Sequence, residues 1–186
     1  MRFAALTLLA VWSVAASAAD FSVDAETGLA TWQIETGGIQ LQLTQISPDQ
    51  ARAFYQARGF SAAMSERYAA ECVFMTVVRN LGNTPIQHRL ADWRYVVAGQ
   101  APRPIRSKAA WERIWKQHGV AEPARIAFAW AQFPATQTFS PGDWNQGMTA
   151  YRVARGASFD LHFAWRTDGK HHSDSLKQVR CADEES

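Results

Sequence analysis

Histidine and methionine are the side chains of this sequence that could hold a metal ion. Three of its five histidines, His162, His171 and His172, lie near the end of the chain, and Met64 adds a soft thioether. Imidazole and thioether groups suit copper, so these residues predict copper binding or delivery as an alternative function. A hairpin turn at 168–169 places His162 about 13 Å or more along its strand from His171. The competing interpretation is that the histidines are solvent-exposed residues of a strand and a turn.

Residues for nucleophilic catalysis form no motif that names a reaction. The sequence contains no GxSxG nucleophile elbow, and serine, histidine and aspartate residues mean nothing for catalysis without geometry. We therefore predict no catalytic residue, no resident cofactor and no enzymatic activity. A small secreted hydrolase is kept as a further alternative.

Two short segments with helical spacing carry more aromatic side chains than a small cap needs. Phe54 and Tyr55 lie in the first, and Trp111 and Trp115 lie in the second. Together they predict a surface that lines a groove for a protein partner or an apolar ligand. The alternative is that the two helices only cover an open end of the fold.

The two cysteines, Cys72 and Cys181, predict one disulfide. An even pair without CxxC spacing, in a chain that reaches an oxidising compartment, is typical of a structural bridge. The alternative is a reactive or metal-binding thiol pair.

The first residues predict export. Arg2 precedes an apolar run, and the small residues at 16–18 are typical of a signal peptide that is cleaved near Ala18-Ala19. No later stretch is apolar enough to span a membrane. We therefore expect residues 19–186 to form a single domain in the periplasm or outside the cell. The 19 basic residues nearly balance the 17 acidic ones, which argues against a nucleic-acid partner.

The elements that position these residues are mostly strands. Apolar runs and alternation predict strands at 29–36, 38–46, 71–80, 86–99, 124–133 and 148–153, and a hairpin at 158–181. Capping residues predict two helices, at 48–58 and 108–118, whereas 61–70 is either a helical turn or a loop. Pro141-Gly142 predicts a tight turn and Gly147 a bend or bulge. The pattern is that of a mainly β chain, an antiparallel β-sandwich with two short helical insertions.

Three stretches carry a resemblance to a known family. They are VFMTVVRNLGNTPI (73–86), FSPGDWNQGMTAYRV (139–153) and SFDLHFAW (158–165). Together they resemble the telokin-like, immunoglobulin-type domains of exported bacterial proteins, from which the two predicted helices depart. The resemblance implies an exported immunoglobulin-like domain and carries no catalytic residues. The predicted function is thus a periplasmic binding or accessory protein whose partner is an unknown periplasmic protein or small ligand.

Overall fold

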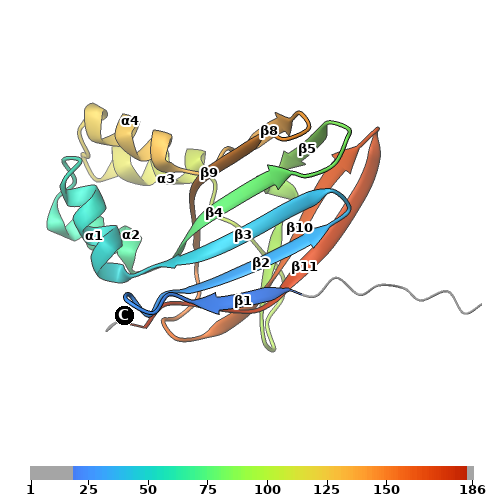
Figure 1. The fold of residues 1–186 in the computed structure, drawn as a ribbon. Helices are drawn as coiled ribbons and strands as arrows, with labels where there is room; N and C mark the ends of the chain where they lie inside the picture. The colour runs from blue at the N-terminus through green and yellow to red at the C-terminus, as the bar shows by residue number, and fades with distance from the viewer. Residues whose placement is uncertain (1–18, 184–186) are drawn as a thin grey trace, which may run out of the picture.

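The computed structural model describes residues 19–183, and these residues form two antiparallel β-sheets and four α-helices. The helices gather at one end of the strands (Figure 1). The predicted signal segment, 1–18, lies outside the described residues. The predicted class, mainly β and sandwich-like, is confirmed, whereas the prediction of only two helices is wrong.

The first sheet is built largely from consecutive strands. It contains β1 (Asp20–Val23), β2 (Ala30–Thr36), β3 (Ile39–Ile46), β4 (Cys72–Asn80) and β9 (Trp144–Tyr151). Their order across the sheet is β1-β2-β3-β4-β9. Gly37 and Gly38 both adopt positive φ in the turn from β2 to β3, as the Gly-Gly pair predicts. β4 lies between β3 and β9, in agreement with its two-sided apolar sequence.

The second sheet is organised around one long hairpin. It contains β5 (Ile86–Arg89), β6 (Arg94–Val97), β7 (Arg103–Pro104), β8 (Thr136–Phe139), β10 (Ser158–Thr167) and β11 (Lys170–Arg180). β11 pairs with one edge of β10, and β6 and β5 pair in succession with the other edge. The predicted strand at 86–99 is divided into β5 and β6 by a 3₁₀ turn over Leu90–Asp92.

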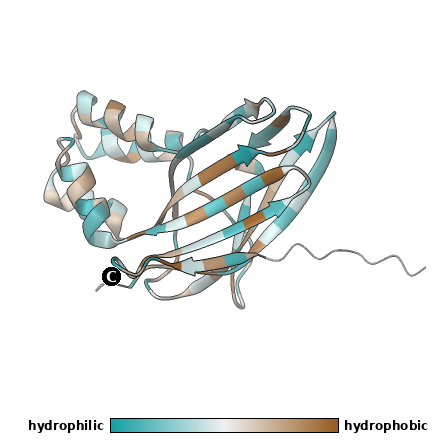
Figure 2. Cartoon of the chain, in the orientation of Figure 1, coloured by the Kyte–Doolittle hydropathy of each residue, from teal (hydrophilic) through white to brown (hydrophobic). Residues whose placement is uncertain are grey.

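Aromatic side chains fill the space between the two sheets. Phe74 of β4 lies edge-on to Phe159 of β10, with ring centroids 6.0 Å apart, and to Tyr151 of β9 at 5.9 Å. Inward apolar residues alternate with outward polar ones along the strands, which gives the banding of Figure 2. The two sheets therefore share one core, as the alternating sequence predicts.

The helices are α1 (Pro48–Gln56), α2 (Ala62–Ala69), α3 (Lys108–Gln117) and α4 (Glu122–Ala131). α1 begins with the predicted capping box, in which Ser47 and Gln50 each bond the other's backbone N–H. Ser107 caps α3 in the same manner through its hydroxyl. The ambiguous segment at 61–70 contains α2.

The predicted strand at 124–133 is wrong, because most of this segment lies in α4. Ile126, Phe128 and Trp130 alternate with alanines, which imitates a strand, but alanine has the highest helix propensity and a proline occupies the first turn. In the helix, Phe128 shares the buried side with Ala124, whereas Ile126 and Trp130 face outward. Trp130 is therefore on the surface.

The helices cover the outer face of the first sheet at one end. Val73 of β4 and Met148 and Ala150 of β9 belong to a second buried cluster, together with Tyr55 of α1 and Phe128 of α4. The molecule thus has three layers at this end and two layers elsewhere.

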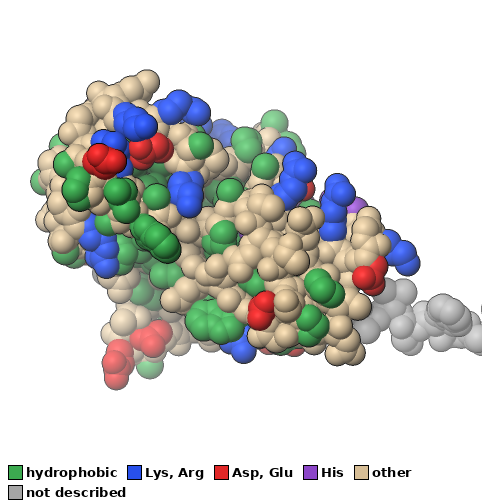
Figure 3. Space-filling view, turned by 90° about the horizontal axis from the view of Figure 1, so that it is seen from above, with side chains coloured by type: hydrophobic (Ala, Val, Ile, Leu, Met, Phe, Trp, Pro, Cys, Tyr) green, Lys and Arg blue, Asp and Glu red, His purple; other side chains and the backbone are tan. Residues whose placement is uncertain are grey.

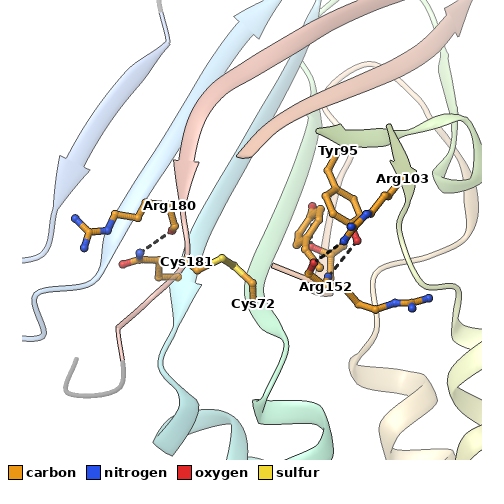
Figure 4. Close-up of a disulfide and its surroundings, with 9 residues drawn as sticks. Cys72, Tyr95, Arg103, Arg152, Arg180 and Cys181 are labelled. Atoms are coloured by element: carbon orange, nitrogen blue, oxygen red, sulfur yellow. Dashed lines mark hydrogen bonds between the residues drawn. A yellow bond between two sulfur atoms is a disulfide. The ribbon is translucent and has the colours of Figure 1, made fainter. Parts of the chain in front are cut away.

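The disulfide and one glutamine hold the end of the chain to the first sheet. Cys72 at the start of β4 is bonded to Cys181 after β11, with an S–S distance of 2.04 Å, as predicted (Figure 4). The side chain of Gln45 accepts a hydrogen bond from the backbone N–H of Ala30 (2.8 Å) and donates one to the carbonyl of Arg180 (2.8 Å). Both links join β11 to strands of the opposite sheet.

Gly147 allows the close approach that the sequence predicts as a bend. A Cβ atom at this position would lie 2.4 Å from the backbone nitrogen of Phe133, inside van der Waals contact. Only glycine therefore lets the chain that leaves α4 run against β9, where the Phe133 N–H donates to the Met148 carbonyl (3.0 Å).

Candidate functional site

The aromatic residues predicted as a partner or ligand surface are mostly interior. Tyr55, Trp111 and Trp115 are at most 1% exposed, and Phe54 is half-buried beneath the guanidinium of Arg58. Trp111 and Trp115 stack on each other, with centroids 4.8 Å apart, inside the helical layer. The prediction of an exposed surface is therefore corrected for these three residues: they cover the end of the sandwich and form its second core.

A buried hydrogen-bond network fixes the end of α4 against this core. The Gln132 amide donates to the Tyr55 hydroxyl (2.8 Å) and accepts from the Tyr68 hydroxyl (3.2 Å). The Tyr55 hydroxyl in turn donates to the Met148 sulfur (3.2 Å). Burial raises the pKa of both tyrosine hydroxyls, so they remain protonated donors. The network holds Gln132 at the inner wall of a surface groove.

This groove lies between the end of α4 and the edge strand β9. Its volume is about 380 Å³, and its lining consists of Lys108, Ala129, Trp130, Gln132, Pro134, Asn145 and Gln146. The Lys108 ammonium donates to the Ala129 carbonyl (3.3 Å) at one side. The groove therefore combines one aromatic ring with amide groups, which can both donate and accept hydrogen bonds.

Two tryptophans next to the groove are exposed to solvent. Trp130 of α4 is 85% exposed and Trp144 of β9 is 52% exposed. Trp144 points to the same face of the strand as Gln146, about 7 Å along it. In the view from above, apolar side chains lie among basic and acidic ones at the helical end (Figure 3). Exposed tryptophans flanking a groove are typical of a binding site, because a ligand gains most by covering them.

The edge of β9 at the groove is fixed by its own side chains. The Asn145 side chain accepts a hydrogen bond from the Gln146 backbone N–H (2.7 Å) and donates one to the Gln137 side chain of β8 (2.7 Å). This pair joins the two sheets where their edges meet. The wall of the groove is thus preformed.

The predicted copper ligands lie apart in the fold. His171 pairs with Arg166 across the β10–β11 hairpin, whereas His162 pairs with Ser175 and bonds its hydroxyl (2.7 Å). His172 stacks on Trp165, and Met64 belongs to the helical layer at the other end of the strands.

No group of three or more His, Cys, Asp or Glu side chains is placed to hold a metal ion within residues 19–183. The structure therefore brings none of the predicted copper ligands together, as the 13 Å estimate for the hairpin indicates. The copper hypothesis gains no support from this arrangement.

Sequence reasoning missed the groove because it placed Trp130 in a strand. A helix over the same residues was signalled by alanine content, by a proline in the first turn and by the four-residue spacing of Ala124 and Phe128. With that helix recognised, Trp130 falls outside the apolar stripe. The exposure of Trp144 could be predicted as well, since it lies two residues before Gln146, on the same face of β9 and close to the Pro141-Gly142 turn.

Comparison of the chain with protein-family models, with curated proteins and with solved structures found no match.

A second depression of similar volume, about 380 Å³, lies at the opposite end beside the β10–β11 turn, but its lining contains no aromatic side chain. The geometry of the groove beside α4 is therefore the basis for a functional proposal.

Proposed function

We propose that this chain is an exported, non-enzymatic binding protein whose ligand or partner occupies the groove between α4 and β9. The observation that carries the proposal is Trp130, an aromatic side chain 85% exposed on the rim of a groove that Gln132, Asn145 and Gln146 line with amides. Burying such a ring stabilises a complex, and preformed amides give it orientation and specificity.

The disulfide and the first residues of the chain support a location outside the cytoplasm. The Cys72–Cys181 disulfide is typical of proteins in an oxidising compartment, and the first 18 residues have a signal-peptide pattern. Among the described residues, the structure contains no helix that could cross a membrane. These features are compatible with a periplasmic or secreted protein.

The two-sheet architecture is compatible with the immunoglobulin-like fold that the sequence resemblance implies, whereas the strand order departs from it. Two antiparallel sheets face each other over one aromatic core. The consecutive order β1-β2-β3-β4 differs from immunoglobulin sheets, which interleave strands that are distant in the chain. The proposed function therefore depends on the groove and not on the immunoglobulin topology.

The test is a thermal-shift screen of small molecules, oligosaccharides and peptides against the oxidised protein, repeated with two variants. Trp130→Ala removes the ring at the groove, whereas Ile126→Ala removes an exposed side chain from the same helix outside the groove lining. We expect ligands that raise Tm for wild type and Ile126→Ala but not for Trp130→Ala. Ligands that stabilise all three proteins equally would place binding elsewhere and overturn the proposal.

A further inference from the structure

The outer face of the first sheet continues the polar lining of the groove. Strand register aligns outward side chains in two rows across β2, β3, β4 and β9. The row that ends in the groove is Gln33, Gln42, Val77 and Gln146, and the row beside it is Glu35, Gln40, Arg79 and Trp144. At about 4.8 Å between strands, each row is about 14 Å long. The helices end before these rows, which leaves them partly or fully exposed.

The two rows carry no net charge, and beside them the charge of Lys108 in the groove is balanced by that of Asp20, which pairs with Gln33 from β1. The acidic residue of the rows, Glu35, accepts a hydrogen bond from the Gln40 amide (2.6 Å), and their basic residue, Arg79, lies over the Trp144 ring at 5.9 Å. The remaining members of the two rows are amides, one valine and the tryptophan. A surface of this composition offers little to a polyanion and gives no charge pattern for an acidic or basic partner to match.

The side chains that are free to bind combine two chemistries. The Gln33 and Gln146 amides have no hydrogen-bond partner among the described residues, and each can both donate and accept. The Trp130 ring lines the groove together with Gln146, and Trp144, two residues before Gln146 on β9, offers a second exposed ring. A matching ligand has hydroxyl groups, which both donate and accept hydrogen bonds, and rings with apolar C–H faces. A sugar chain has both features.

An extended peptide matches the site less well. A peptide that adds to an edge strand needs alternating free N–H and C=O groups. On β9, the Gln146 N–H is bonded to the Asn145 side chain and the Met148 carbonyl accepts from Phe133. The edge therefore lacks the ladder that a peptide strand would use.

We propose that the groove and the adjoining rows bind an uncharged oligosaccharide. Trp130 and Trp144 stack on sugar rings, and Gln146 and Gln33 bond their hydroxyls. The proposal rests on the proposed function, since it assigns a ligand class to the same groove, and it extends the site across the sheet.

The experiment is calorimetric titration of the oxidised protein with uncharged tetrasaccharides of glucose, of N-acetylglucosamine and of mannose. We expect at least one of them to bind, and Trp130→Ala and Trp144→Ala each to raise Kd by about tenfold through loss of ring stacking. Gln146→Ala raises Kd less. Ile126→Ala, one helical turn before Trp130 and outside the groove lining, leaves Kd unchanged, and circular dichroism of each variant confirms that it folds.

The remaining outcomes separate the two proposals. If no tetrasaccharide binds but a peptide or an apolar compound binds in a Trp130-dependent way, the groove is a site and its assignment to sugars is wrong. If a tetrasaccharide binds with the same Kd after Trp130→Ala and after Trp144→Ala, both proposals fail, because the sugar binds elsewhere. If neither the tetrasaccharides nor the screened compounds bind, both proposals fail.

Discussion

The stability of the protein should depend on pH through one buried histidine. His88 of β5 is 1% exposed, and neither ring nitrogen has a hydrogen-bond partner among the described residues. Its ring centroid lies 5.1 Å from that of Phe133 and 5.7 Å from that of Phe139, with Trp93 on a third side at 5.8 Å. Burial among these rings penalises the charged imidazolium and lowers the pKa of His88 from 6.5 to about 4.

The sign of the effect follows from the two pKa values. The unfolded chain takes up this proton near pH 6.5, whereas the folded protein resists it until about pH 4. The contribution of neutral His88 is therefore complete above pH 6.5 and is lost as the pH falls from 6.5 towards 4. At 1.36 kcal/mol per pKa unit, the full loss is about 3 kcal/mol, and the part that falls between pH 7 and pH 5 is about 2 kcal/mol.

Urea denaturation followed by tryptophan fluorescence measures this loss at pH 7, 6 and 5. The His88→Leu variant removes the titrating group and keeps an apolar side chain of similar size. We expect wild type to lose about 2 kcal/mol more than His88→Leu between pH 7 and 5. Parallel pH curves for wild type and His88→Leu would refute the reasoning.

Three further predictions concern the links between layers. Replacing both Cys72 and Cys181 by alanine should lower the free energy of unfolding by about 4 kcal/mol in urea titrations, because the bridge closes a loop of about 110 residues; unchanged stability would contradict this. Gly147→Ala should cost about 1–3 kcal/mol by the same assay, since its Cβ would meet the Phe133 backbone. Gln132→Leu should cost about 1–3 kcal/mol, because the buried Tyr68 hydroxyl loses its acceptor and the Tyr55 hydroxyl keeps only the Met148 sulfur, and a neutral effect would show that the network does not hold α4.

The strands were predictable where the alternation of apolar and polar residues and a turn signal indicate the same hairpin. The segments at 29–46 and 158–181 each alternate on both sides of a glycine-containing turn, and both fold as the expected hairpins. The disulfide was predictable as well, because only two cysteines are present. Each hairpin depends on residues that are close in the sequence, and two cysteines allow only one pairing.

The candidate site was harder to predict, because it depends on packing between distant segments. Tyr55 and Trp111 look like a recognition surface in sequence, and only the docking of α1 and α3 on the sheet buries them. Trp130 looks like a core residue in an alternating run, and only the choice of helix over strand exposes it. Aromatic content indicated the correct end of the molecule, but exposure decides which rings can bind.

The position of the groove follows from how the third layer is attached. Gly147 lets the chain after α4 lie against β9, and Gln132 bonds two buried tyrosines, so the last turn of the helix is fixed relative to the sheet. Trp130, two residues earlier, is then held at the rim and cannot turn into the core, because Phe128 already occupies the buried side. Because the backbone that carries this ring is already fixed, a ligand has only the side chain to order on binding, which limits the loss of conformational entropy. The same contacts that complete the fold therefore prepare the surface that we propose as the binding site.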